Sequence, residues 1–201
     1  MPDWKLTWED YDVSGDNLNE VSDAIFRSRA HAGKTRFGFN YQVRYAGHDG
    51  QVLQFKIEAI EWQCTVELPK WIDPPDLPEA EAEKREFRRF RSQVRLHEIG
   101  HVAIYDIRMT LLIAAIVDQP AGHGQVPATK VPEYDEAGEP KGTLDRQISE
   151  AVDREVRRII TEHREFQTMQ EQHARYDAVP HPTDNPHGTD HGKTQGAVLR
   201  Q

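Results

Sequence analysis

The chain has 201 residues, of which 37% are hydrophobic and 29% charged, a composition typical of a single soluble globular domain. The formal net charge of −9 argues against binding to nucleic-acid phosphates and to anionic membranes, so we expect no nucleic-acid partner. Cys64 is the only cysteine, which excludes an intramolecular disulfide. The longest apolar run, from Leu111 to Val117, is too short to span a bilayer, and the charged N-terminus lacks the apolar core of a signal peptide.

Residues 1–70 predict a small antiparallel sheet with one helix. A short strand ends at Gly15, and Asp16 is positioned to cap the helix that follows. Hydrophobic residues alternate from Phe37 to Tyr45, which is typical of a strand with one buried face. A turn leads into a partner strand, whose alternation shifts phase at Ile60 and so predicts a bulge or a break.

The rest of the chain predicts two long helices. Residues 71–78 are rich in proline and form a linker, and a helix follows over about 78–118. A loop over 119–142 leads to a second helix, about 143–177, whose apolar residues recur with a period near 3.6. The expected architecture is an α+β fold in a single domain (1–201), with a sheet lobe (1–70), a two-helix lobe (79–178) and an irregular tail (179–201).

The sequence HEIGH, from His97 to His101, lies in the middle of the first long helix. Residues four apart on a helix differ by only about 40° around its axis, so both histidines point the same way and can bind one metal ion. Glu98 lies beside them, where its carboxylate can take a proton from a metal-bound water. This pattern predicts zinc ligands at His97 and His101 and a general base at Glu98. The alternative is a chance match on a solvated helix.

The residues around this motif make two further predictions. Gly100 costs about 1 kcal/mol relative to alanine in a helix interior, which favours a neighbour packed close against it. The other apolar positions predict a face that buries the helix, formed by Leu96, Ile99, Val102, Ala103 and Ile107.

The motif leaves the third zinc ligand open. In metzincins a histidine follows six residues after the second ligand, but Ile107 occupies that position and excludes this class. Glu162 and Glu165 on the second helix are candidates. His163 and His173 lie on the apolar stripe of that helix, which favours buried, hydrogen-bonded histidines. The C-terminal region offers four more candidates, Asp177, His181, His187 and His191.

Three blocks of sequence resemble a bacterial family of predicted secreted zinc-dependent proteases, long catalogued as a domain of unknown function. The first block is DYDVSGDNLNEVSDAI, a strand followed by a helix, and the second is CTVELPKW, shortly before HEIGH. The third is YD, at Tyr176 and Asp177, followed by TDHGKTQGA near the C-terminus. These blocks span nearly the whole chain, so the resemblance is more specific than HEIGH alone.

The resemblance implies a zincin-like metalloprotease in which His97, His101 and His191 hold Zn²⁺ and Glu98 is the catalytic base. The spacing before the last histidine is longer than in the family and introduces a competing histidine, His187. We prefer His191, because TDHGKTQGA matches the family on both sides of it.

Two residues of the same block have further implied roles. Asp177 is expected to orient a ligand or to replace one. Tyr176 is expected to donate a hydrogen bond to the oxyanion of the transition state, with helix–helix packing as an equal alternative.

We therefore expect a zinc-dependent metallohydrolase, most simply a peptidase that acts on a peptide or protein substrate. The alternative is a non-catalytic zinc-binding module with an interaction or regulatory role, and a hydrolase of another amide shares the same site. Family members usually look exported, whereas no signal peptide is visible here. The compartment therefore stays open between secreted, periplasmic and cytoplasmic, and the sequence does not determine the oligomeric state.

Overall fold

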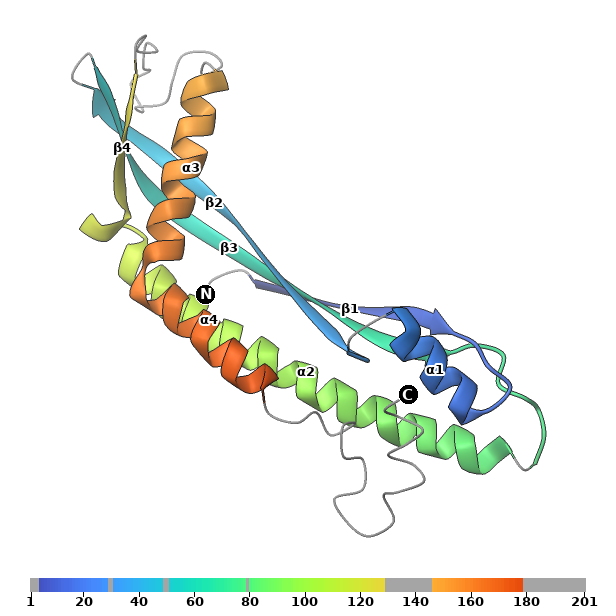
Figure 1. Ribbon diagram of the computed structural model, residues 1–201. Coiled ribbons are helices and arrows are strands. Elements are labelled where there is room, and N and C mark those ends of the chain that lie inside the picture. Colours follow the sequence, from blue (N-terminus) through green and yellow to red (C-terminus); the bar gives the residue numbers. More distant parts are fainter. Residues whose placement is uncertain (1–3, 29–30, 49–50, 79, 129–145, 179–201) are drawn as a thin grey trace. The chain divides into compact units, whose positions relative to one another are not determined.

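The computed structural model describes residues 4–28, 31–48, 51–78, 80–128 and 146–178, and it has the α+β fold class that the sequence predicts. The elements in chain order (Figure 1) are β1 (Trp4–Val13), α1 (Leu18–Ser28), β2 (Lys34–His48), β3 (Val52–Trp71), α2 (Ala80–Ile116), the short 3-10 helix η1 (Pro120–Gly122), β4 (His123–Pro127), α3 (Arg146–Glu162) and α4 (Arg164–Asp177). The tail 179–201, with His181, His187 and His191, lies outside the described residues.

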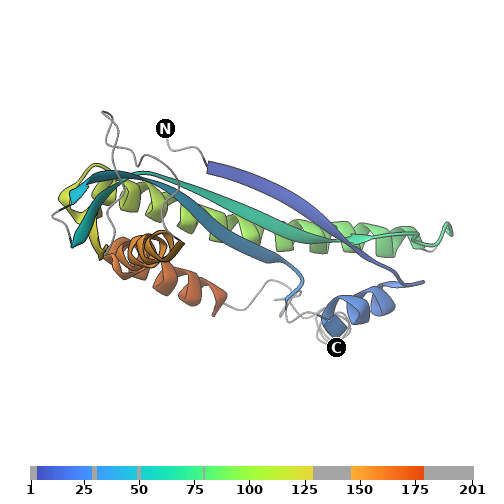
Figure 2. The same ribbon diagram turned by 90° about the horizontal axis from the view of Figure 1, so that it is seen from above.

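The strands form one four-stranded sheet in the order β1-β3-β2, with β4 also paired to β3. Strand β4 is antiparallel to residues 52–56 of β3. Strand β1 runs in the same direction as β3 (Figure 2). The hydrogen bond from the amide of Ile72 to the carbonyl of Val13 agrees with this, since it joins the C-terminal ends of both strands. The sheet is therefore mixed, and the prediction of an antiparallel sheet is wrong here. Helix α1 and strand β2 lie between β1 and β3 in the sequence, and this connection is long enough for a parallel pairing.

Strand β3 shows how the predicted phase shift is accommodated. Buried positions alternate as far as Ile57 and resume at Ile60, with two half-buried residues between them. The strand continues without a break from Val52 to Trp71. Its buried face therefore changes phase inside one long strand, as at a bulge.

Two predictions for the C-terminal half are corrected. The second long helix is divided into α3 and α4, and His163 between them caps α4, since its Nδ1 accepts a hydrogen bond from the amide of Glu165 at 3.2 Å. The apolar stripe continues across the division, so its period does not reveal the break. The predicted loop 119–142 contains η1 and β4, a five-residue strand too short to show an alternating pattern.

Two side-chain hydrogen bonds cap the start of helix α1. The side chain of Asn17 accepts from the amide of Glu20 at 3.1 Å, and the carboxylate of Glu20 accepts from the amide of Asp16 at 2.9 Å. The cap is therefore Asn17, one residue after the predicted Asp16.

The described residues divide into two compact units, each with its own core. Counting only the described residues, the first unit lies within 4, 38–62 and 105–171, and the second lies within 5–37, 63–104 and 172–178. Both predicted lobes contribute to each unit, because β2, β3, α2 and α4 supply residues to both.

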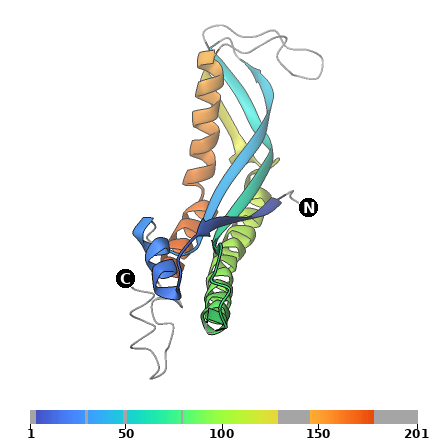
Figure 3. The same ribbon diagram turned by 90° about the vertical axis from the view of Figure 1, so that its right-hand side faces the viewer.

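In the first unit, helix α3 contacts strand β4 and lies beside the β2–β3 hairpin (Figures 1 and 3). Its core includes the buried side chains of Leu53, Phe55, Ile57, Met109, Leu112, Ile116, Ile160 and Met169. Phe39 meets Phe166 edge to face, with ring centroids 6.2 Å apart.

In the second unit, the start of α1 is tied to the start of α2, because the carboxylate of Glu83 accepts from the amide of Leu18 at 3.1 Å. Trp71, at the end of β3, packs edge to face on Phe87 of α2, with ring centroids 5.6 Å apart. The core includes Val21, Ile25, Cys64, Val66, Leu68, Phe87, Phe90 and Val94.

Helix α2 leaves most of the predicted apolar face exposed. Leu96, Ile99 and Ile107 are 68%, 41% and 59% exposed, and Ala103 is exposed too, whereas Val102 is buried as predicted. The buried positions recur every three to four residues and include Phe87, Phe90, Val94, Glu98, His101, Tyr105, Met109, Leu112 and Ile116. Apolar residues lie on both faces of this helix, so their period alone does not select the buried one.

Helix α2 also bears on the expected absence of a membrane span. Among the described residues it is the one helix with a segment long and apolar enough to cross a membrane by length and composition, and 33% of that segment is buried. Core helices of soluble proteins satisfy the same conditions. The helix is therefore weak evidence and does not confirm a span.

Candidate metal centre

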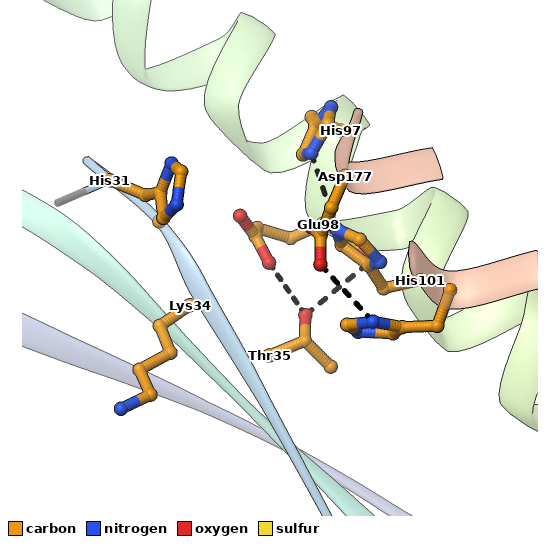
Figure 4. Close-up of a pocket in the computed structure, with 9 residues that line it drawn as sticks. His31, Lys34, Thr35, His97, Glu98, His101 and Asp177 are labelled. Carbon is orange, nitrogen blue, oxygen red and sulfur yellow. Dashed lines mark hydrogen bonds and ion pairs between the residues drawn. The ribbon is translucent and has the colours of Figure 1, made fainter. Parts of the chain in front are cut away.

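Three segments of the second unit meet around the HEIGH motif. Helix α2 contributes His97, Glu98 and His101, the last turn of α4 contributes Asp177, and Thr35 comes from the start of β2 (Figure 4). They surround a cavity of about 230 Å³. Its lining residues are His31, Gly33, Lys34, Thr35, His97, Glu98, His101, His173 and Asp177.

Three potential ligand atoms converge at this cavity. The Nε2 atoms of His97 and His101 are 3.2 Å apart, and Oδ1 of Asp177 is 3.2 Å from Nε2 of His101. One ligand atom from each residue lies within 4.8 Å of the other two. Tetrahedral zinc with bonds of about 2.1 Å needs ligand atoms about 3–4 Å apart, so the site fits such an ion after small adjustments.

The chemistry of the donor set points the same way. The two facing imidazole nitrogens can share one proton in an N–H···N hydrogen bond, and a cation between them would equally satisfy both lone pairs. The carboxylate of Asp177 adds a negative charge on the same side of the helix. His101 is buried and Asp177 is about half exposed, so the site is open to solvent on the side of α4.

His173 holds the second oxygen of Asp177. Its Nδ1 lies 3.2 Å from Oδ2 of Asp177, one helical turn along α4, and its ring centroid is 4.4 Å from that of His101. The sequence favoured a buried, hydrogen-bonded role for His173. Its hydrogen-bonding partner is a candidate metal ligand, so His173 belongs to the site.

Glu98 is buried, with 3% of its surface exposed. This burial raises the pKa of its carboxyl group, the hydrogen bond from Thr35 opposes that rise, and the nearby charge of Asp177 adds to it. The Thr35 hydroxyl donates to Oε2 of Glu98 at 2.7 Å. The buried carboxylate is thus held by Thr35, through its hydroxyl group and through its backbone amide.

The side chain of Tyr176 packs directly against Gly100 of helix α2. A Cβ atom at residue 100 would lie 2.1 Å from the Tyr176 hydroxyl oxygen, so the glycine makes room for the phenol ring. The ring stacks on His97 and meets His101 edge to face, each with centroids 4.8 Å apart. Tyr176 does not line the cavity, which favours the packing role over the predicted hydrogen bond to an oxyanion. The catalytic role of Tyr176 stays a prediction.

The other candidate ligands lie elsewhere. Glu162 pairs with Arg158, and Glu165 pairs with Arg108, all within the first unit. His191 and His187 lie outside the described residues, so their assignment as ligands stays a prediction.

Comparison with known proteins places the whole arrangement in a family. Residues 8–188 match the model of a family described as a bacterial protein of unknown function (DUF922). No curated protein and no solved structure matches the chain. The matched segment includes the HEIGH motif, both segments that complete the cavity and nearly all of the fold described above, so the chain belongs to the DUF922 family of bacterial proteins.

Proposed function

We propose that the chain is a zinc-dependent metallohydrolase, most simply a peptidase, in which His97, His101 and Asp177 hold the metal and Glu98 is the general base. The observation that carries the proposal is the convergence of two imidazole nitrogens and a carboxylate oxygen within 4.8 Å, beside a buried glutamate. Catalytic zinc sites use three protein ligands of these types and leave a further position open.

The chemistry follows from the positions of the side chains. Zinc, when bound, lowers the pKa of a coordinated water and polarises a substrate carbonyl. Oε2 of Glu98 accepts the hydrogen bond from Thr35, which leaves Oε1 as the oxygen that would accept a proton from an attacking water. His173 fixes the orientation of the Asp177 carboxylate through its second oxygen.

Metal content tests the ligand set. We expect stoichiometric zinc in the wild-type protein, loss of zinc in His101→Ala, and an affinity more than about tenfold weaker in Asp177→Asn. Asp106→Asn on the same helix is the matched control and keeps its zinc. Loss in His191→Ala with retention in Asp177→Asn would transfer the third ligand to His191, with His187→Ala as the paired comparison. Retention in every variant would refute the zinc site.

Turnover separates the hydrolase from the non-catalytic zinc module. We expect zinc-loaded wild-type protein to cleave members of a broad peptide library, and Glu98→Gln to lower the rate by about 100- to 10,000-fold while zinc stays bound. His123→Ala, an exposed histidine of β4, controls for nonspecific loss. Equal rates in the wild type and Glu98→Gln, with zinc present in both, would contradict the peptidase and leave the zinc-binding module.

A further inference from the structure

We infer that Thr35 is the positioning residue for the general base: its hydroxyl fixes the orientation of the Glu98 carboxylate in the cavity that the candidate ligands line. This inference rests on the proposed function and goes beyond it, because it assigns a role to strand β2, whose Thr35 lies 63 residues before Glu98 in the sequence.

The first support is the hydrogen bond itself. The Thr35 hydroxyl lies 2.7 Å from Oε2 of Glu98 and 3.5 Å from the backbone carbonyl oxygen of the same residue. A hydroxyl has one proton, so it donates to the nearer acceptor, the carboxylate. Hydrogen bonds to a charged acceptor are stronger than those between neutral groups, and this one is sheltered because Glu98 is 3% exposed.

The second support is Gly33, which closes the other side of the carboxylate. A Cβ atom at residue 33 would lie 2.4 Å from Oε1 of Glu98 and 2.8 Å from its Cγ. The backbone of Gly33 therefore lies directly against the side chain. Thr35 holds one oxygen while Gly33 limits where the other can go.

The third support is the position of this segment in the site. Gly33, Thr35 and Glu98 all line the same cavity as the candidate ligands, and Figure 4 shows Thr35 facing Glu98 from β2. Lys34 lies between Gly33 and Thr35 in the sequence, and its side chain points away from the histidines (Figure 4). The alternation of the strand thus presents Thr35 to Glu98 and turns the adjacent lysine away.

The consequence is a base that needs no reorganisation when substrate arrives. A glutamate side chain has several rotamers, and only some bring an oxygen toward the metal. A donor fixed on a strand selects one of them, which is how catalytic groups gain from orientation. Loss of the hydroxyl should therefore slow the chemical step and leave zinc binding and substrate binding intact.

The test compares Thr35→Val, which keeps the shape and removes the hydroxyl, with Thr35→Ser, which keeps the hydroxyl. Thr65→Val is the matched control, because Thr65 is a half-buried threonine of β3 that does not line the cavity. Each zinc-loaded variant is assayed for zinc content, thermal unfolding, and kcat and KM on a cleaved library peptide. We expect Thr35→Val to lower kcat about ten- to a hundredfold with zinc content and KM unchanged. Thr35→Ser and Thr65→Val should stay close to the wild type.

A second background separates positioning from a general structural effect. In Glu98→Gln, the added Thr35→Val change should cause no further loss, because the two residues act as one unit. Binding of acetohydroxamic acid, measured by calorimetry on the zinc-loaded protein, gives a readout without turnover. Its hydroxamate proton needs an acceptor beside the metal, so Thr35→Val and Glu98→Gln should both weaken binding.

The outcomes distinguish the two proposals. Full activity and full hydroxamate affinity in Thr35→Val, together with losses in Glu98→Gln, would overturn the role of Thr35 alone. An equal loss in Thr35→Ser and Thr35→Val, or an additive loss in the Glu98→Gln background, would also overturn it. A Glu98→Gln variant that matches the wild type in both readouts would overturn the proposed function and this inference with it.

Discussion

Gly100→Ala is the change for which two opposing effects can be worked out from the structure. In an ordinary helix interior this substitution stabilises by about 1 kcal/mol, because alanine loses less backbone entropy than glycine. Here the new Cβ atom would lie 2.1 Å from the hydroxyl oxygen of Tyr176 and 2.3 Å from its Cζ. Ordinary contact requires the phenol ring to move by more than about 1 Å.

That movement is opposed by the neighbours of the ring. Tyr176 is stacked on His97 and meets His101 edge to face, so it cannot move without displacing a candidate zinc ligand. Overpacking of this kind costs about 1–3 kcal/mol. We expect the clash to outweigh the propensity gain, so that Gly100→Ala lowers the free energy of unfolding by about 1 kcal/mol. Zinc affinity should fall as well, because Asp177 follows the displaced tyrosine.

Urea unfolding and zinc titration of four variants test this reasoning. Ala103→Gly, at an exposed position of the same helix, measures the propensity difference alone and should cost about 1 kcal/mol. In a Tyr176→Ala background the sign should reverse, and Gly100→Ala should then stabilise by about the same amount. A Gly100→Ala protein that is more stable than the wild type, with unchanged zinc affinity, would refute the close packing of Tyr176 on the helix.

Three further predictions concern stability. The phenol of Tyr41 donates to Asp153 and holds the pKa of that carboxyl below its usual range, so this hydrogen bond stabilises the fold above the unfolded-state pKa of Asp153 and the stabilisation is lost as pH falls through the folded-state pKa. Tyr41→Phe should lower the free energy of unfolding in urea by about 1 kcal/mol at pH 7. A stability difference between wild type and Tyr41→Phe that does not shrink below about pH 4 would contradict this. Val94→Ala should lower the free energy of unfolding by about 2 kcal/mol and Leu96→Ser by less than about 0.5 kcal/mol, because Val94 is fully buried and Leu96 is 68% exposed. A larger loss in Leu96→Ser than in Val94→Ala would instead support burial of the face predicted from sequence. Zinc at one hundred times its dissociation constant should raise the free energy of unfolding by about 2.7 kcal/mol and EDTA should reverse it, whereas unchanged thermal unfolding would argue against a metal site in the folded protein.

Strands β2 and β3 and the first long helix could be predicted because their periods are strong. The alternation from Phe37 to Tyr45 falls within β2, and the apolar and charged residues from 80 to 116 form one helix, α2. The division between α3 and α4 could not be predicted, since the apolar stripe runs through it and the capping residue is a histidine. The direction of β1 depends on which strand it pairs with, and that is a long-range choice that a local pattern does not contain.

The candidate site was predictable only in part, for a related reason. His97, Glu98 and His101 are local, and a helical spacing of four is enough to bring both histidines to one side. Asp177 was one of four candidates that the C-terminal region offered, and the sequence alone did not single it out. Thr35 was missed, because its strand was expected to begin at Phe37 and a threonine carries no metal-binding signature. Nothing in the local sequence indicates that β2 reaches Glu98.

The assembly of the site from three distant segments has a consequence for the newly made chain. The ribosome synthesises the chain from its N-terminus, so Thr35 and the whole HEIGH motif leave the ribosome before Asp177 at the end of α4. An incomplete chain that stops before α4 contains Glu98 and both histidines but lacks Asp177 and Tyr176, which complete their surroundings. Completion of α4 is therefore the step at which a nascent chain first contains all three of the proposed metal ligands.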